Sequence, residues 1–355
     1  MSKRRNGCLF RLSLYCKLVI PVALTNEKME MKTISVVMAT YNGEKYLREQ
    51  IDSVIAQTYP VSELIIQDDC STDGTVDVVR QYLEKYPFIK FFVNEQNVGY
   101  NENFRRAAMH ATGDYVAFSD QDDIWLPQKL ERQVEAIGDS DICFSNTLDG
   151  ENLENSTPCP DRRYTLETII WGNQVLGHTM LCRRKFVQNA EHWQGDGYYD
   201  KSLVLHALIG GSVTKVGEPL NFHRRLPWSV TYMPVPAVTW QPYVYGWQAY
   251  RRWQSHPPYR SMHTYFYKHT TGTPHTTANR MLRLMLRRDI LSLLRLCWLC
   301  MKHRRDTYPA PPAAGIKGMV RGFFLPQIVA YGWQQREIYN KQRYETRLIN
   351  QTDCR

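Results

Sequence analysis

The feature that most limits the possible folds is an alternation of short apolar runs with segments of helical spacing. Thr33–Ala39 is a largely β-branched run, which is typical of a strand buried on both faces. Three further short apolar runs follow at Leu64–Gln67, Ile89–Val93 and Tyr115–Phe118. Strands that alternate with helices predict a parallel sheet with right-handed crossovers, so we expect an α/β fold. The predicted helices between them are Glu44–Gln57, Thr75–Leu83 and Asn103–His110.

Polar side chains follow three of the four predicted strands at the point where each strand ends. They are Thr40, Tyr41 and Asn42 after the first, Asp68 and Asp69 after the second, and Asp120, Gln121, Asp122 and Asp123 after the fourth. In such sheets ligands bind beyond the carboxyl ends of the strands. The sequence therefore predicts that these separate segments meet at one rim and form a ligand site.

The acidic run after the fourth strand is the strongest candidate for a metal site. Asp120, Asp122 and Asp123 lie within one short stretch, and like charges this close are unfavourable unless a cation or donors neutralise them. Oxygen ligands suit a hard divalent cation, Mg²⁺ or Mn²⁺, which also binds substrate phosphates. The alternative is a solvated acidic loop in which one aspartate caps the helix that follows Pro127.

Asp68 and Asp69 also allow two interpretations. A carboxylate at a strand end is able to accept hydrogen bonds from the base or ribose of a nucleotide. Alternatively, the pair belongs to a simple turn in which Ser71 or Asp73 caps the next helix. The sequence has no G-x-G-x-x-G after the first strand and no G-x-x-x-x-G-K-[ST], which argues against a dinucleotide site and a P-loop.

Charge divides the chain into an acidic body and a basic end. Residues 31–225 carry a net charge of −9, and residues 226–355 carry +14. The acidic body argues against a nucleic-acid groove, whereas the basic end suits an anionic membrane face. We expect Arg280–Met301 to form one basic amphipathic helix that either lies in a membrane interface or packs on the catalytic domain.

The cysteines and the N-terminus bear on location. Nine cysteines without a disulfide framework predict reduced thiols and a cytoplasmic protein. The basic C-terminal region adds the expectation of a peripheral place on the inner face of the plasma membrane. Residues 1–30 resemble a signal peptide, but Arg11 and Lys17 interrupt the apolar stretch, so we expect a dispensable extension. Since no apolar run reaches about 20 residues, a transmembrane helix is not expected.

Four ordered runs resemble family 2 glycosyltransferases, and among these the bacterial rhamnosyltransferase-like group. They are V-V-M-A-T-Y-N-G, I-I-Q-D-D-C-S-T-D-G-T, N-V-G-Y-N-E-N-F and A-T-G-D-Y-V-A-F-S-D-Q-D-D-I-W-L-P. The resemblance covers roughly residues 33–225. It implies the GT-A fold, a Rossmann-like, mostly parallel sheet flanked by helices, together with an inverting reaction and a divalent metal. We expect a catalytic domain at residues 31–230 and a basic, aromatic-rich helical region at 231–355.

The resemblance also implies a nucleotide pocket. Ala39 and Tyr41 would line the base pocket, and Asp69 would contact a uracil or thymine ring, with Asp68 behind it. The resemblance implies that Asp120 holds the ribose or the donor sugar. The other residues for which it implies contact with substrate are Thr40, Asn42, Glu44, Asn97, Gly99, Asn103, Gln121 and His178. His178 taken alone is more often a structural residue.

The resemblance implies a metal ligand and a catalytic base as well. Asp122, the last residue of the D-x-D element, would coordinate the cation, and Asp200 would deprotonate the acceptor hydroxyl. Taken alone, Asp200 is equally a carboxylate at a helix N-terminus. Relatives often carry an Arg-x-His pair near a closing loop, where this chain has Leu226 after Arg224. Because of that departure, the sequence does not say which further residue binds the metal or whether the loop closes.

The leading interpretation is an inverting hexosyl- or rhamnosyltransferase. It would move a sugar from a UDP- or dTDP-sugar to a hydroxyl of a glycan or lipid-linked acceptor in cell-surface polysaccharide synthesis. One alternative is a sugar-1-phosphate nucleotidyltransferase, although Thr40–Lys45 is not the basic, glycine-rich loop that such enzymes carry. The other is a degenerate, non-catalytic assembly partner at the membrane, for which Leu226 is the support.

Overall fold

The computed structural model describes residues 31–161, 163–194, 197–210, 212–226, 240–272, 276–308 and 315–352. Lys32–Arg355 forms one compact unit. The expected N-terminal extension, residues 1–30, lies outside the described residues.

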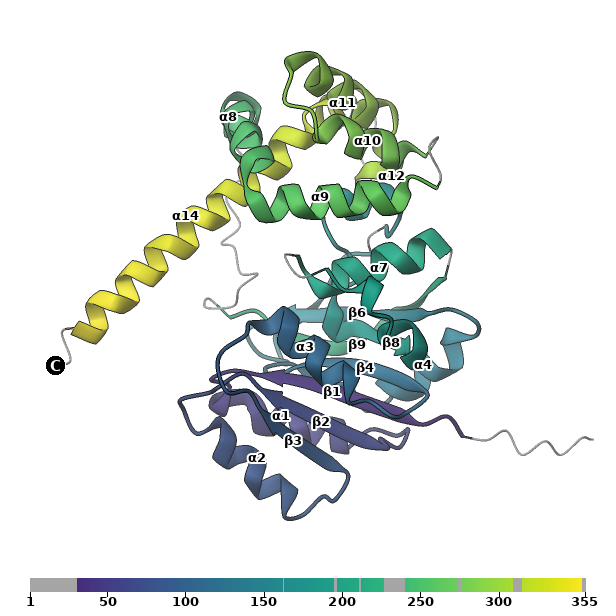
Figure 1. The fold of residues 1–355 in the computed structure, drawn as a ribbon, viewed down its shortest axis with the longest axis vertical. Coiled ribbons are helices and arrows are strands. Elements are labelled where there is room, and N and C mark those ends of the chain that lie inside the picture. Colours follow the sequence, from purple (N-terminus) through teal and green to yellow (C-terminus); the bar gives the residue numbers. More distant parts are fainter. Residues whose placement is uncertain are drawn as a thin grey trace, which may run out of the picture. The chain divides into compact units, whose positions relative to one another are not determined.

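The first part of this unit alternates strands and helices (Figure 1). Its elements are β1 (Ile34–Thr40), α1 (Glu44–Ile55), β2 (Glu63–Asp68), α2 (Thr75–Leu83), β3 (Ile89–Val93), α3 (Tyr100–Met109), β4 (Tyr115–Asp120), β5 (Ile124–Trp125), α4 (Lys129–Ile137), β6 (Ile142–Gly150), β7 (Thr157–Pro158), α5 (Leu166–Trp171), the short 3₁₀ helix η1 (Gly177–Thr179), β8 (Met180–Arg183), α6 (Arg184–Val187), η2 (Ala190–His192), α7 (Tyr199–Gly210) and β9 (Val213–Arg224). The strand–helix alternation expected from the sequence is thus confirmed through β4.

The strands form one mixed sheet in the order β3-β2-β1-β4-β8-β6-β9-β5, with β7 paired to β6. Strands β1 to β4 run parallel to one another, and β8 is antiparallel to both of its neighbours. The register places Thr40 opposite Asp68 and Ala39 opposite Asp120. The polar ends of β1, β2 and β4 therefore lie along one edge, as the sequence predicts.

Alternate side chains of the sheet pack into two separate cores. Val36 and Met38 of β1 belong to a cluster with α1, α2 and α4, whereas Val37 belongs to a cluster on the opposite face with α3 and α7. Burial of β1 on both faces explains its continuous apolar sequence. The sheet is flanked by helices on both sides, which confirms the expected α/β class.

Seven helices follow the sheet in the described residues, and Figure 1 shows α9, α10 and α11 in green. They are α8 (Gln241–Ser255), α9 (Pro257–Thr270), α10 (Thr277–Met285), α11 (Ile290–Lys302), α12 (Arg304–Thr307), α13 (Gly315–Phe323) and α14 (Leu325–Thr352). Trp253 and Phe266 share the cluster that contains Phe118 of β4 and Leu203 of α7. The C-terminal helices are therefore packed on the α/β region and complete its core.

The single helix expected over Arg280–Met301 is two helices, so that prediction is wrong. α10 ends at Met285 and α11 begins at Ile290. Asp289 starts the second helix because its Oδ1 accepts a hydrogen bond of 2.7 Å from the Ser292 amide. None of the helices in the described part of the chain combines the length and the hydropathy of a membrane-spanning segment.

Candidate functional site

The loops after β1 and β4 are joined at the rim by a pair of hydrogen bonds. The Tyr41 amide donates to Gln121 Oε1 at 2.8 Å, and Gln121 Nε2 donates to the Tyr41 carbonyl at 3.0 Å. Tyr41 is 48% exposed. Asn42, with a positive φ of 48°, turns the chain sharply and accepts the Thr72 amide at 2.8 Å. This turn presents Tyr41 beside the residues that end β4.

Three of the predicted substrate residues have bonds that stabilise the loops. Thr40 Oγ1 and the Ser71 hydroxyl both donate to Asp68 Oδ1, at 2.8 and 2.6 Å. Asp68 is fully buried, so it lies behind the rim. Glu44 Oε2 accepts the Gly74 amide at 3.0 Å. The loops after β1 and β2 are thereby fixed to each other.

Asp69 organises the loop between β3 and α3. Its carboxylate accepts the amides of Val98 and Gly99, each at 2.8 Å, and Asn94 Nδ2, also at 2.8 Å. Gly99 has a φ of +83°, which favours glycine. Asn97 Nδ2 donates to the Asp69 carbonyl at 3.2 Å. Since a carboxylate offers about four acceptor positions, Asp69 keeps little capacity for a further partner.

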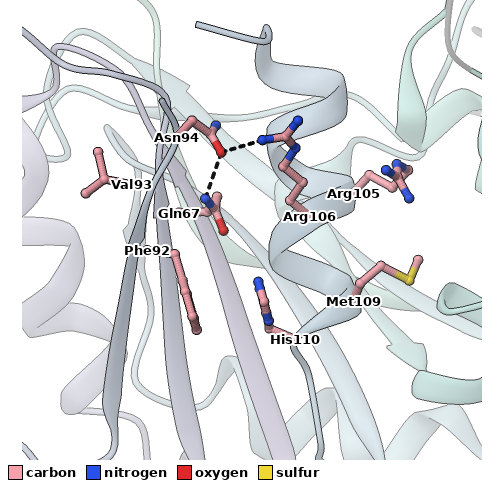
Figure 2. A pocket seen from close by; sticks show the side chains of 8 residues that line it. All are labelled: Gln67, Phe92, Val93, Asn94, Arg105, Arg106, Met109 and His110. Atoms are coloured by element: carbon pink, nitrogen blue, oxygen red, sulfur yellow. Dashed lines mark hydrogen bonds between the residues drawn. The ribbon is translucent and has the colours of Figure 1, made fainter. Parts of the chain in front are cut away.

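Asn94, which the sequence analysis missed, connects Asp69 to a cavity of about 340 Å³ beside α3 (Figure 2). Its Nδ2 also donates to Asn103 Oδ1 at 2.8 Å, and its Oδ1 accepts Gln67 and Arg106 at 3.0 Å each. The cavity is lined by Gln67, Phe92, Val93, Asn94, Arg105, Arg106, Met109 and His110. The sequence feature that points to Asn94 is its position directly after the third predicted strand. That strand is the one of the four without a polar group assigned to its end.

A cluster of three potential metal ligands lies at the end of β4. One atom each from Asp120, Asp123 and His178 lies within 4.8 Å of the others. His178 Nδ1 forms a buried ion pair with Asp123 Oδ2. Asn221 of β9 also contacts the cluster, because its Nδ2 lies 2.8 Å from His178 Nδ1. The predicted ligand Asp122 neighbours this cluster in the chain but is not a member of it.

The three carboxylates at the end of β4, those of Asp120, Asp122 and Asp123, disfavour one another's charged forms. Burial, together with the charges of Asp123 and Asp120, raises the pKa of Asp122 to about 7. Burial also raises the pKa of Asp120. Asp123 Oδ1 is buried and has no hydrogen-bond partner among the described residues. Two carboxylates, one of them with an unsatisfied oxygen, and an imidazole are a donor set that fits a divalent cation.

Asp200 lies in the first turn of α7, close to the cluster. Its Oδ1 accepts the Lys201 amide at 2.7 Å, and Asn173 and the Gly177 amide also hydrogen-bond to its carboxylate. Burial raises the pKa of Asp200 to about 6, and the charge of Asp120 adds to this effect. Gly177 permits the arrangement, because a Cβ at that position would lie 1.9 Å from the Tyr199 hydroxyl oxygen.

The segment around Leu226 supplies a histidine and an arginine to the site. The ring centroids of His223 and His178 are 4.7 Å apart, and His223 Nδ1 lies 3.4 Å from Asp149 Oδ1. Arg224 Nε donates to the Asp122 carbonyl at 3.1 Å, and its Nη2 lies 2.7 Å from Glu49 Oε2. Leu226 itself is buried, and the next residues, 227–239, lie outside the described part of the chain.

Comparison with known proteins gives matches in the same region. Residues 35–186 match the profile of glycosyl transferase family 2. Bacillus subtilis TuaG, named for teichuronic acid biosynthesis, is 38% identical over 149 residues, which are 42% of this chain and 59% of TuaG. The B. subtilis glycosyltransferase EpsE is 43% identical over 102 residues, 28% of this chain and 37% of EpsE. The matched segments thus span less than two thirds of these relatives.

Solved structures match over most of the fold, among them a mannosyltransferase. The mannosyltransferase PcManGT of Pyrobaculum calidifontis, solved in complex with GDP-Man and Mn²⁺, superposes with a TM-score of 0.50. The alignment covers 88% of each chain at 15% sequence identity. At this identity the likeness concerns the fold, and it agrees with the mixed sheet and flanking helices described above.

Proposed function

Since residues 35–186 match the profile of glycosyl transferase family 2, we propose that the chain transfers a sugar from a nucleoside diphosphate sugar to a hydroxyl group. The observation that carries this proposal is the meeting of four separate segments at one rim. Strands β1 and β2 bring Tyr41 and Asp69, β4 brings Asp120, and α7 brings Asp200. This arrangement offers a nucleotide-facing side, a cation site and a carboxylate close to each other.

The proposed donor pocket lies between the β1, β2 and β4 loops. Tyr41 provides an exposed ring for the base, and Ala39 forms the floor beside Asp120. Asp69 fixes Asn97 and Gly99 by its hydrogen bonds and thereby shapes the same pocket. The donor we propose is a UDP- or dTDP-sugar, and the transferase is of the hexosyl or rhamnosyl type.

We propose that Asp122 holds a divalent cation together with members of the Asp120–Asp123–His178 cluster. A bound Mg²⁺ or Mn²⁺ would neutralise the diphosphate leaving group of the donor. Burial and, after it, the charges of Asp123 and Asp120 raise the pKa of Asp122, and a cation that stabilised its charged form would offset these effects. His178 orients Asp123 through their ion pair.

Asp200 is proposed as the general base. Its hydrogen bonds from Lys201 and Gly177 fix the carboxylate at the start of α7. It would take the proton of the acceptor hydroxyl, whose oxygen then attacks the anomeric carbon from the face opposite the diphosphate. The C–O bond to the diphosphate breaks as the new glycosidic bond forms, so the anomeric configuration inverts.

The acceptor we propose is a growing glycan or a lipid-linked glycan of a cell-surface polysaccharide, and the location is the cytoplasmic face of the membrane. The TuaG name, which refers to teichuronic acid biosynthesis, supports the polysaccharide class. The basic C-terminal helices, with a charge of +14 over residues 226–355, support contact with an anionic surface.

A donor-hydrolysis screen tests the proposed activity. The purified full chain is incubated with UDP- and dTDP-sugars in Mn²⁺ or in a chelator, and the released nucleoside diphosphate is measured. We expect release from a subset of donors, in Mn²⁺ only. Release of inorganic diphosphate from a nucleoside triphosphate and a sugar 1-phosphate would support the nucleotidyltransferase instead. Donor binding without any turnover, in the presence of acceptor glycans, would support the non-catalytic alternative.

The pH dependence should show the elevated pKa of Asp200. A general base acts in its deprotonated form, so kcat/KM should fall as the pH drops through about 6, by about tenfold per unit below that value. Carboxylates that bind the cation also titrate, but the pH at which they lower kcat/KM should shift with Mn²⁺ concentration. The pH at which protonation of Asp200 lowers kcat/KM should not shift. A plateau extending down to about pH 4, the usual range for aspartate, would contradict a base in this surrounding.

Asn94→Ala should weaken donor binding about tenfold, with a smaller change in turnover. The substitution leaves Asp69 and Asn103 without a buried hydrogen-bond donor, which costs about 1.5–3 kcal/mol for a charged acceptor. The measurement is nucleotide affinity by calorimetry. Arg106→Gln is the matched control, because Arg106 donates to Asn94 Oδ1 and does not contact the Nδ2 that Asn94 donates to Asp69. Equal affinities of the two variants would show that Asn94 does not shape the pocket.

A further inference from the structure

Helices α10 and α11 enclose a second cavity, of about 310 Å³. Its lining is dominated by guanidinium groups and contains no carboxylate. The residues are Arg280, Arg283, Leu284, Arg287, Arg295, Trp298 and Leu299. We call this the arginine cavity. It belongs to neither the carboxylate cluster nor the loops after β1 and β2.

The sequence spacing gathers the charges on facing sides of the two helices. Arg280 and Arg283 are three residues apart on α10, and Arg287 follows in the turn between α10 and α11. Arg295 and Trp298 are three residues apart on α11. Asp289 caps α11 through Ser292 and so fixes the turn that brings the two faces together.

The four arginines form no ion pair with a described residue, although the hydrogen bonds from Ser292 and, to a smaller extent, the charge of Arg287 lower the pKa of Asp289. None of the ion pairs within that part of the chain includes Arg280, Arg283, Arg287 or Arg295. The nearby carboxylate of Asp289 accepts hydrogen bonds from the amide and hydroxyl of Ser292. Four like charges around one cavity repel one another, and an anionic ligand would offset this repulsion.

An exposed apolar stripe lies beside the cavity on α11. Ile290 is 51% exposed, Leu291 61%, Leu294 42% and Trp298 51%. The spacing of these residues places them on one side of the helix, away from the buried Leu293, Leu296 and Leu299. Lys302 Nζ lies 5.4 Å from the Trp298 ring centre. Apolar and aromatic side chains bordered by cations are the composition of helices that lie in a membrane interface.

We propose that the arginine cavity binds the phosphate group of an anionic membrane phospholipid while the α11 stripe enters the interface. Guanidinium groups match phosphate oxygens in charge and geometry. A nucleic acid fits less well, because large aliphatic side chains border the cavity and residues 31–225 carry −9. The inference specifies the site of the proposed membrane contact and does not depend on which sugar is transferred.

Vesicle co-sedimentation of the full chain tests the site. We expect binding to phosphatidylcholine vesicles that contain phosphatidylglycerol and much weaker binding to phosphatidylcholine alone. The double variant Arg283→Gln/Arg287→Gln should bind the anionic vesicles about 30-fold more weakly, since each basic residue near an anionic surface contributes roughly fivefold. Trp298→Ala should also reduce binding, because the indole would leave the interface.

The matched control is Arg251→Gln/Arg252→Gln on α8, which removes the same charge from two exposed arginines outside the cavity. A loss of less than about threefold is expected there. Equal losses in the two double variants would overturn the cavity in favour of diffuse attraction. Saturable binding of inorganic phosphate or of a short oligonucleotide at the cavity would also overturn the lipid site, if the parent chain did not sediment with anionic vesicles.

Nucleotide binding and thermal unfolding are measured on the same preparations. Vesicle binding that is lost in the cavity variants, in folded protein, supports the lipid site whatever the donor screen shows. Wild-type protein that hydrolyses a donor but ignores anionic vesicles overturns the lipid site and leaves the transferase assignment standing.

Discussion

Asp200→Asn should lower the turnover of sugar transfer by about 100-fold or more, the usual contribution of a general base. Asparagine has nearly the same shape as aspartate but accepts no proton at neutral pH. The acceptor of the Lys201 amide, Asp200 Oδ1, has an equivalent in the asparagine carbonyl oxygen, so the start of α7 should keep its geometry. Donor affinity should therefore remain within about twofold, because the donor contacts proposed here lie on β1, β2 and β4.

Single-turnover transfer and nucleotide calorimetry separate the two effects. Asp139→Asn is the matched control, since this aspartate is fully exposed and lies 3.9 Å from its nearest partner, Arg183. The variant should behave as the wild type in both measurements. Near-normal turnover of Asp200→Asn would remove Asp200 from the role of base. A parallel loss of donor affinity would instead make it a residue that positions the donor.

Much of the α/β region follows from local sequence patterns. β1 is largely apolar because both of its faces are buried, and the same applies to Leu64–Ile66 in the middle of β2. Parallel neighbours align their carboxyl ends, so the positions of Asp68 and Asp120 at strand ends predict a common rim, which the register of the strands confirms. These expectations depend on period and on chain direction, which are both visible in the sequence.

The pairings within the site depend on long-range contacts, which the sequence does not show. Three aspartates within four residues do not reveal which of them points inward. In the fold it is Asp123 that pairs with His178, because β8 lies antiparallel beside β4 and brings η1 to the rim. Asn94 likewise has a role only through Asp69, 25 residues away. The sequence also gives no sign that Arg287 and Arg288 lie in a turn between two helices.

The local environment separates the expected effects of substituting Asp122 and Asp123. Asp122→Ala should abolish Mn²⁺-dependent nucleotide binding without destabilising the cation-free protein. Its raised pKa means that the folded chain disfavours the charged form, so the cost of this carboxylate grows as the pH rises from about 4 to about 7. Above that range the alanine variant should be as stable as the wild type or more stable.

Asp123→Ala should lower stability itself, by about 3–5 kcal/mol, because a buried partner loses its counter-charge. Burial opposes the charge of His178, but its ion pair with Asp123 raises the pKa of His178 to about 9. Thermal unfolding in a chelator measures this loss, and nucleotide affinity with and without Mn²⁺ measures the cation site. Asp139→Ala, an exposed change of the same kind, should alter neither quantity.

Asp120→Ala completes the comparison, since Asp120 belongs to the three-residue cluster and Asp122 does not. Loss of the Mn²⁺ effect in both variants is expected if the cation bridges the D-x-D element and the cluster. Tight, Mn²⁺-stimulated binding by Asp122→Ala alone would exclude Asp122 and leave Asp120, Asp123 and His178 as the ligands. If Mn²⁺ still promoted binding in both variants, the carboxylates at the end of β4 would not hold the cation. The repulsion between these carboxylates would then be relieved by protonation alone.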